Sequence, residues 1–252
     1  MKKILYAFLA AVITVSCAGG GQPDYNALWA DLEQKASALE SDASMSDEQK
    51  YDALKNLFLE TYSEHKSDSL GLKIFVPLIA SFCTMEEALA LYEESPELIR
   101  EDSKIKVRIE CVRNKSTVTP GNPYKEINGT DALTGEALKL SSFIGGGKAL
   151  LVDFWASWCA PCRREIKSHL LELASQGRVN IVGVAVWEDS VEDTRKAMSE
   201  LGIRWPVIFT GGRENSPSIE YGVLSIPTLF LISPEGTIIA SGHSIEDFAD
   251  KL

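Results

Sequence analysis

The chain has 252 residues, of which 25 are Lys or Arg and 36 are Asp or Glu, so its formal net charge is −11. Such a charge repels phosphate backbones and anionic lipid heads, and nucleic acid is therefore not an expected partner. With 45% hydrophobic and 24% charged residues the composition is globular, which excludes a disordered or fibrous chain and allows one large domain or two small ones.

The first residues have the pattern of an export signal. Two lysines precede an apolar run, 4–15, that is too short to cross a bilayer, which takes about 20 residues. Small residues then lead into a cysteine, Thr14–Cys17, and this segment resembles the lipobox of bacterial lipoproteins. The resemblance implies a signal peptide over 1–16, a lipidated Cys17, a tether over 17–23 and a place in the cell envelope; cleavage and release is the alternative.

Residues 24–119 have helical patterning and are predicted to form an all-α domain. Leucines and alanines recur at spacings of three and four from Leu28 onward, and a last helix is predicted over about 103–115. We find no nucleophile–base pair, glycine-rich phosphate loop or metal-ligand spacing in this segment. A packing or docking role is therefore expected for it.

Two capping boxes and one apolar run mark further helices in this segment. Ser46–Gln49 and Thr84–Glu87 each place Ser or Thr three residues before Gln or Glu, which predicts a helix start at each. The run Leu70–Phe82 is almost continuously apolar and contains Pro77, which predicts a buried, kinked helix.

A turn-forming stretch, Pro120–Pro123, marks the predicted boundary to a second domain over 120–252. Beyond it, apolar runs typical of buried strands alternate with amphipathic segments typical of helices, which predicts a mixed α/β sheet with helices on both faces. The turn Pro234–Gly236 joins the last two strands as a hairpin. The predicted strands are 149–155, 179–187, 207–209, 228–232 and 237–240, and the predicted helices are 162–174, 191–201 and 245–252.

The chemistry is predicted at Cys159 and Cys162, a C-x-x-C pair that follows a buried strand and opens a helix. Unpaired N–H groups and the macrodipole at a helix start favour a thiolate at Cys159, so its pKa should fall below the ~8.5 of a free cysteine. Pro161 suits the first helical position. One turn separates the sulfurs, so the pair can cycle between dithiol and disulfide. A zinc half-site and a static disulfide are the alternatives, but zinc usually needs four ligands and no second C-x-x-C exists.

Two blocks of this domain, Val152–Arg163 and Tyr221–Ile232, resemble the thioredoxins and, more closely, the membrane-tethered TlpA/ResA-like thiol-disulfide oxidoreductases. The resemblance covers about residues 125–252 and implies a thioredoxin-like fold. It implies reduction of protein disulfides in the envelope, for instance in proteins awaiting haem attachment, without cofactor or metal. A membrane-bound electron donor would regenerate the dithiol. The helical segment resembles, less specifically, the N-terminal extensions of some exported members.

The resemblance also implies roles for single residues. Cys159 would be the exposed nucleophile that attacks a substrate disulfide, and Cys162 would resolve the mixed disulfide. Asp153 would exchange a proton with the resolving thiol, and its place in an apolar run predicts burial and a raised pKa; a solvated aspartate at a strand edge is the alternative. The residues implied at the substrate-binding surface are Trp158, Pro161, Ile226 and a cis Pro227.

Some residues depart from the family or remain open. Lys167 stands where many relatives have a proline that kinks the active-site helix, so that helix is predicted to be straighter here. Glu165 fits an acidic position of the TlpA-like members or a plain helix surface. Cys83 and Cys111 are either paired or two buried free thiols.

The other polar and aromatic candidates have ordinary interpretations. His169 is predicted at the surface, although its helix could bring it near the site. His65 and His243 are also predicted at the surface. The aromatic residues predicted to pack in the core are Trp155, Trp187, Trp205 and Tyr221.

Three other functions compete with a reductase. Ala160 and Pro161 between the cysteines resemble the reducing members more than the strong oxidants, but an oxidase or isomerase stays open. A thiol peroxidase is disfavoured because the P-x-x-x-T-x-x-C signature is absent around Cys159. A non-enzymatic, partner-binding lipoprotein is the remaining alternative.

Overall fold

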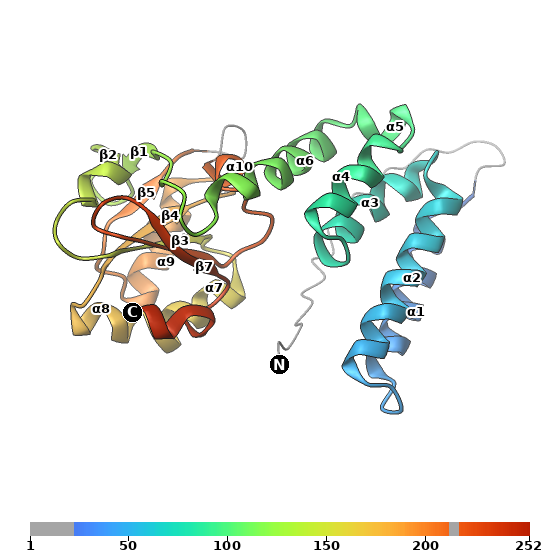
Figure 1. The fold of residues 1–252 in the computed structure, drawn as a ribbon, viewed down its shortest axis with the longest axis horizontal. Helices are drawn as coiled ribbons and strands as arrows, with labels where there is room; N and C mark the ends of the chain where they lie inside the picture. Colours follow the sequence, from blue (N-terminus) through green and yellow to red (C-terminus); the bar gives the residue numbers. More distant parts are fainter. Residues whose placement is uncertain (1–22, 212–216) are drawn as a thin grey trace.

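The computed structural model describes residues 23–211 and 217–252. An all-helical region over residues 25–118 is followed by a mixed sheet with helices, which confirms the predicted fold class (Figure 1). The predicted signal peptide and the lipidated Cys17 lie outside the described residues. Within 23–211 and 217–252, no helix combines the length and the apolar character needed to cross a membrane.

Most helices of the helical region begin at a side chain that accepts hydrogen bonds from the first turn. Asp24, Asp68 and Asp102 cap three of them, and both predicted capping boxes are formed, at Ser46 and Thr84. A four-residue helix, too short to show a periodicity, was not predicted. The helices are α1 Tyr25–Ser41, α2 Asp47–His65, α3 Ser69–Ser81, α4 Met85–Glu93, α5 Glu97–Arg100 and α6 Ser103–Lys115.

Helix α3 forms the centre of this region. Leu70, Ile74, Phe75 and Leu78 have no exposed surface, and they pack against apolar side chains of the other helices. Pro77 lies inside the helix. The predicted buried helix is therefore confirmed. It is buried because apolar side chains project from nearly every side of it.

The sheet has seven strands in the order β2-β1-β5-β4-β3-β6-β7. Its central strands β3, β4 and β5 are parallel, and the remaining pairs are antiparallel. The parallel strands are covered on both faces, which explains their continuous apolar sequences. The strands are β1 Asn128–Asp131, β2 Ala137–Lys139, β3 Leu150–Trp155, β4 Asn180–Ala185, β5 Val207–Phe209, β6 Thr228–Ile232 and β7 Ile238–Gly242.

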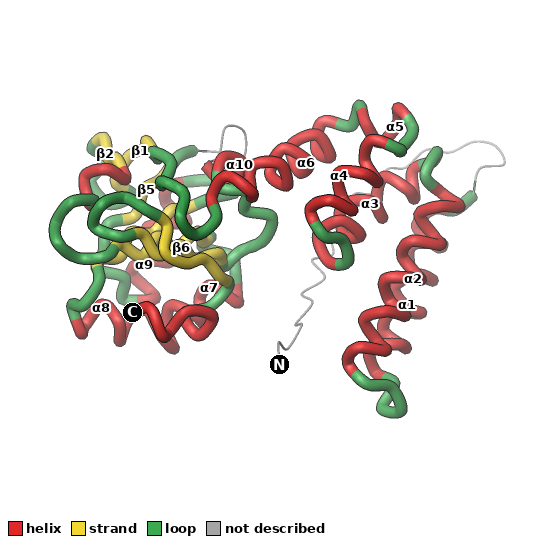
Figure 2. The backbone as a smooth tube through the Cα atoms, in the orientation of Figure 1, coloured by secondary structure: helices red, strands yellow, loops and turns green. Residues whose placement is uncertain are grey.

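Helices flank the sheet unequally (Figure 2). One face packs against α7 Ala160–Glu165, α8 Leu171–Gln176 and α9 Val191–Leu201. The other face is covered by shorter segments, namely the 3-10 turns Ser116–Val118 and Leu140–Phe143 and the residues around α10 Pro217–Glu220. A further 3-10 segment, Ile245–Lys251, follows β7 where a short helix is predicted.

The segment from α7 to α8 contains Lys167, where the missing proline predicts a straighter helix than in many relatives, and it is not α-helical throughout. A π-helical turn, Ile166–Leu170, joins the two α-helical parts. Such turns insert one extra residue into a helix and are frequent at functional sites.

Candidate active site

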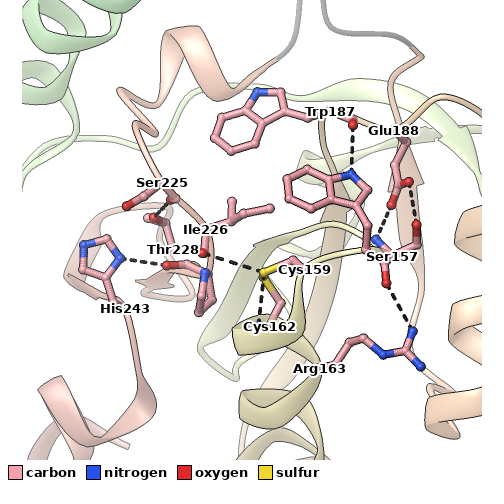
Figure 3. The surroundings of a disulfide bond; sticks show 12 residues. Ser157, Cys159, Cys162, Arg163, Trp187, Glu188, Ser225, Ile226, Thr228 and His243 are labelled. Carbon is pink, nitrogen blue, oxygen red and sulfur yellow. Dashed lines mark hydrogen bonds between the residues drawn. A yellow bond between two sulfur atoms is a disulfide. The ribbon is translucent and has the colours of Figure 1, made fainter. Parts of the chain in front are cut away.

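The C-x-x-C pair lies where a central strand passes into a helix (Figure 3). β3 ends at Trp155, a short loop follows, and Cys159 is the N-cap of α7, with Pro161 in the first turn. The two sulfurs form a disulfide of 2.03 Å, and the Cα atoms are 5.3 Å apart. The backbone N–H of Cys162 donates to Cys159 Sγ at 3.1 Å. This N–H group, one of the donors of the first helical turn, would also stabilise a thiolate on Cys159 in the reduced protein.

Both cysteines are buried in this disulfide-bonded state, so the prediction of an exposed Cys159 is wrong. Cys159 is 3% exposed and Cys162 is 1% exposed. The reason is that Cys159 Sγ packs against the segment before β6, 3.7 Å from the carbonyl oxygen of Ile226. The neighbouring Trp158 is 43% exposed. The residue before Cys159 thus reaches the surface, whereas both cysteines are covered in this state.

Asp153 lies in the middle of β3 and is 1% exposed. Side chains alternate along a strand, so Asp153 shares a face with Leu151 and Trp155, which belong to the apolar cluster that contains both cysteines. Neither carboxylate oxygen has a hydrogen-bond partner among the described residues. Burial, and then the nearby Glu165 carboxylate, raise the pKa of Asp153 from 3.8 to about 8. The predicted burial and raised pKa are confirmed, and a solvated aspartate is excluded.

Glu165 is also buried, so the plain surface position left open for it is wrong. Its carboxylate accepts hydrogen bonds from Ser244 Oγ, at 3.0 and 3.1 Å, and from the Ile245 N–H at 2.8 Å. His169, one turn later, brings Nδ1 within 3.1 Å of Glu165 Oε2. His169 therefore contacts one buried acid of the site, Glu165, which the surface interpretation does not anticipate.

A third buried carboxyl group, Glu188, was missed at the level of the sequence. It is 2% exposed, and it accepts hydrogen bonds from the Ser157 N–H and, at 2.8 Å, from the Ser157 hydroxyl. Burial raises the pKa of Glu188 above its usual value. Glu188 thus holds the loop that leads into Cys159. One signal existed: two acids, Glu188 and Asp189, follow the apolar run 179–187 at the carboxyl end of a parallel strand, where ligands commonly bind.

Trp187 packs against the apolar core of the sheet region but is only partly buried, so the predicted core position is met in part. Its φ of 59° is rare for a bulky residue. Its carbonyl oxygen accepts a hydrogen bond from Trp158 Nε1 at 3.2 Å, and its own Nε1 donates to Ser218 Oγ at 3.2 Å. The other three aromatic residues, Trp155, Trp205 and Tyr221, are buried as predicted.

The Ile226–Pro227 peptide bond is cis, as the family resemblance implies, and the loop that contains it lies beside the disulfide (Figure 3). His243 is exposed, but its Nδ1 lies 2.7 Å from the carbonyl oxygen of Pro227. The antiparallel pairing of β6 with β7 brings these residues together. Sequence alone gives no signal for this contact.

The two other cysteines within 23–211 and 217–252 do not form a second disulfide. Cys83 and Cys111 are free thiols, of which Cys111 is buried and Cys83 partly exposed. Within the described part of the chain, no three His, Cys, Asp or Glu side chains are grouped so that they could hold a metal ion. The described chemistry therefore centres on the Cys159–Cys162 pair and its buried acids.

Known proteins resemble this chain over the sheet region. Residues 120–241 match the AhpC/TSA family. The thiol:disulfide interchange protein CycY of Rhizobium leguminosarum bv. viciae is 37% identical over 108 residues, which are 43% of this chain and 53% of CycY. The thiol:disulfide interchange protein HelX of Rhodobacter capsulatus is 33% identical over 124 residues, which are 48% of this chain and 68% of HelX. The chain thus spans about half the length of CycY and two thirds of HelX.

One solved structure gives the corresponding spatial comparison. The thioredoxin domain of a thiol-disulfide oxidoreductase from Bacteroides vulgatus is 28% identical, with a TM-score of 0.45. The match covers 52% of this chain and 94% of that domain.

Proposed function

Because the chain belongs to the thiol-disulfide oxidoreductase family through its sheet region, we propose that it reduces protein disulfides with the Cys159–Cys162 dithiol. The observation that carries the proposal is the position of this pair at a helix start, beside a buried acid. The cysteines belong to the same apolar cluster as Leu151 and Trp155, which share a strand face with Asp153, and the pKa of Asp153 is raised to about 8. A nucleophile and a group that can take up or release a proton near neutral pH are thus combined.

The reaction is an exchange of two disulfide bonds. The Cys159 thiolate attacks one sulfur of the substrate disulfide, a mixed disulfide forms, and the first substrate thiolate leaves. Cys162, as a thiolate, then attacks Cys159 Sγ and expels the second substrate thiolate. The substrate gains two electrons and two protons, and the enzyme pair becomes the disulfide described above. A dithiol donor of lower potential must supply two electrons before the next cycle.

Asp153 is proposed to take the proton of the Cys162 thiol in the second step. A carboxylate in the apolar interior is a stronger base than one in water, because burial disfavours its charge. Glu165 adds to this effect through its negative charge. The proton can return to the resolving thiolate when the donor reduces the disulfide.

The substrate protein is proposed to bind across Trp158 and the loop with Ile226 and Pro227. Trp158 is the exposed large apolar side chain next to the disulfide, and the Ile226 carbonyl lies 3.7 Å from Cys159 Sγ. Export through the N-terminal signal and anchoring through a lipidated Cys17 remain proposals. So do the envelope location, the membrane-bound electron donor and the disulfide-bonded substrates.

The oxidase, isomerase and peroxidase alternatives are less well supported. The Ala160 and Pro161 dipeptide favours a reductase over a strong oxidant, and the peroxidase signature is missing around Cys159. A redox titration against glutathione separates the first two, since a potential near −120 mV is typical of strong oxidants and one near −270 mV is typical of thioredoxin. We expect a value closer to the latter.

Reduction of insulin disulfides tests the proposal directly. The full chain, purified in mild detergent with dithiothreitol as donor, should accelerate insulin reduction, and Cys159→Ser should abolish the acceleration. Cys162→Ser should instead trap a mixed disulfide that a reductant releases. No acceleration by the intact chain, or full activity in Cys159→Ser, would contradict a reductase.

A further inference from the structure

The two regions of the molecule meet along helix α6 and the segment around α10 (Figure 1). Asn114 Nδ2 donates to the carbonyl oxygen of Ile219 at 3.0 Å. Gly222 comes so close to α6 that an added Cβ would lie 2.6 Å from Lys115 Cα. Leu224, from the sheet region, packs against the apolar core of the helical region. The segment 219–224 is therefore fixed on the helical region, and it runs directly into the loop of Ile226.

Arg108 on α6 contacts described residues of the sheet region in two ways. Its Nη1 donates to the carbonyl oxygen of Leu224 at 3.0 Å. Its guanidinium carbon lies 5.3 Å from the ring centroid of Trp187, a cation–π geometry. A planar guanidinium can donate from its edge and stack with its face at once, which an ammonium cannot do.

Both contacts of Arg108 are made with segments that lie next to Cys159. Leu224 is two residues before Ile226, whose carbonyl oxygen lies 3.7 Å from Cys159 Sγ. Trp187 accepts the hydrogen bond of Trp158, the exposed residue next to Cys159. The loop before β6 and the indole of Trp158 are thus both held by segments that one side chain of the helical region contacts.

We propose that Arg108 is a positioning residue for substrate binding, which fixes the Leu224–Pro227 loop and the Trp187–Trp158 pair on the two sides of Cys159. This inference rests on the proposed function for its kinetic consequence, but its structural consequence does not. The helical region is then part of the substrate-binding apparatus, although it contributes no reacting group.

The same helix offers a matched control. Arg113 also stacks on an aromatic ring, 5.9 Å from the centroid of Tyr92, and it pairs with Glu93 at 3.1 Å. Both of these partners belong to the helical region. Arg113→Met therefore removes the same kind of side chain and contact without touching the loops beside Cys159.

The first measurement is hydrogen–deuterium exchange on the oxidised full chain. In Arg108→Met, the peptides that cover 224–228 and 187–188 should exchange at least about threefold faster than in the wild type. Arg113→Met should leave them unchanged. Arg108→Lys, which keeps the charge and most of the stem, should be intermediate, and it serves in place of Arg108→Met if that variant does not fold.

The second measurement is kinetic. The KM for insulin should rise about tenfold in Arg108→Met, because the binding loop is no longer held in place, while kcat changes less than about twofold. Reduction of the Cys159–Cys162 disulfide by dithiothreitol should keep its rate, since a small thiol needs no docking surface. In a Trp187→Leu background, Arg108→Met should raise the KM for insulin by a smaller factor than it does in the wild type.

The outcomes separate the two proposals. If Arg108→Met matches Arg113→Met in exchange at 224–228, Arg108 does not position the loop and the inference is wrong. If exchange rises but the KM for insulin does not, the loop is anchored by Arg108 but does not bind substrate, and the positioning role is again wrong. An intact chain that fails to reduce insulin contradicts the proposed function alone, and the exchange result then still decides whether Arg108 holds the loop.

Discussion

Among the described residues, the buried side-chain polar atoms without a hydrogen-bond partner belong to the sheet region and not to the helical region. In the helical region, the buried Ser95 hydroxyl is hydrogen-bonded to the Tyr62 hydroxyl at 2.6 Å and to the Leu91 carbonyl. In the sheet region, Asp153 is buried with neither oxygen hydrogen-bonded among the described residues. Burying a carboxyl group in this way costs stability, and the group responds by holding its proton to a higher pH.

This difference separates a region built for packing from one that carries chemistry. Satisfied polar groups are the rule in protein interiors, and exceptions call for an explanation. Asp153 is such an exception, and it lies on the strand face that packs in the same apolar cluster as the reactive cysteines. The buried Glu165 raises the pKa of Asp153 further. Substitutions at four positions give five predictions that sharpen or break the comparison, in order of decreasing effect.

Phe75→Ala should have the largest effect on stability without changing the redox chemistry. Phe75 has no exposed surface and packs against the rings of Tyr62 and Tyr92, so the cavity should cost about 3–5 kcal/mol in free energy of unfolding. Denaturant unfolding measures the loss. The reduction potential of the Cys159–Cys162 pair, measured without denaturant, should stay the same. A shifted potential would show that the helical core also tunes the site and would break the comparison.

Asp153→Asn should stabilise the protein at neutral pH. The folded-state pKa is about 8 and the ordinary value is 3.8, so between these pH values the folded state binds a proton that the unfolded state has released. The free energy of unfolding of the wild type therefore falls as pH rises from about 4 to 8. The variant lacks this dependence and should gain on the order of 3 kcal/mol relative to the wild type between pH 4.5 and pH 7.5. Parallel stability–pH curves would contradict the raised pKa.

Asp153→Asn should slow the second exchange step, although it stabilises the fold. Without the carboxylate, deprotonation of Cys162 loses its base, so the second exchange step should slow by about 10²-fold. The step that titrates near pH 8 in the rate profile should also disappear. Stopped-flow release of a reduced substrate peptide from the mixed disulfide measures this step. An unchanged profile would remove Asp153 from the mechanism while leaving the cysteine pair in place.

Glu188→Ala should cost about 1–3 kcal/mol, because it leaves the Ser157 N–H and hydroxyl without their buried acceptor. Glu188→Gln keeps an acceptor of the same shape and should cost less than half as much. Thermal unfolding measures both, and Trp158 fluorescence reports the displacement of the loop. Equal losses for Ala and Gln would mean that the charge of Glu188, and not its hydrogen bonds, holds the loop.

Ser46→Ala should have the smallest effect. It removes the N-cap of α2, whose hydroxyl accepts a hydrogen bond from the Gln49 N–H at 3.2 Å, and should cost about 1 kcal/mol with no change in insulin reduction. Ser63→Ala, an exposed position in the same helix, is the matched control and should lie within about 0.5 kcal/mol of the wild type. A change in activity from Ser46→Ala would show that the far end of the helical region reaches the site.

Local sequence features predicted much of the fold. The capping boxes at Ser46 and Thr84, the helices 103–115 and 191–201 and the strands 207–209 and 228–232 agree with the structure. Strands β1 and β2 were missed because they are short and half-exposed, and β1, with the sequence NGTD, has no apolar alternation. The π-helical turn at Lys167 was missed because nothing in its sequence distinguishes it from an α-helix.

Local sequence was sufficient for the cysteine pair and the buried Asp153, because a helix start marks the first and an apolar strand marks the second. The cis Pro227 was implied by the resemblance to the thiol-disulfide oxidoreductases, since an X-Pro bond by itself leaves both isomers open. Only the tertiary structure decided that Cys159 is covered, that Glu188 holds Ser157 and that Arg108 contacts Leu224. Those contacts join residues 31 and 116 positions apart in the two hydrogen-bonded cases. These contacts form because the order of the strands and the packing of α6 bring distant segments together. Local hydrophobic periodicity carries no information about which distant segments become neighbours.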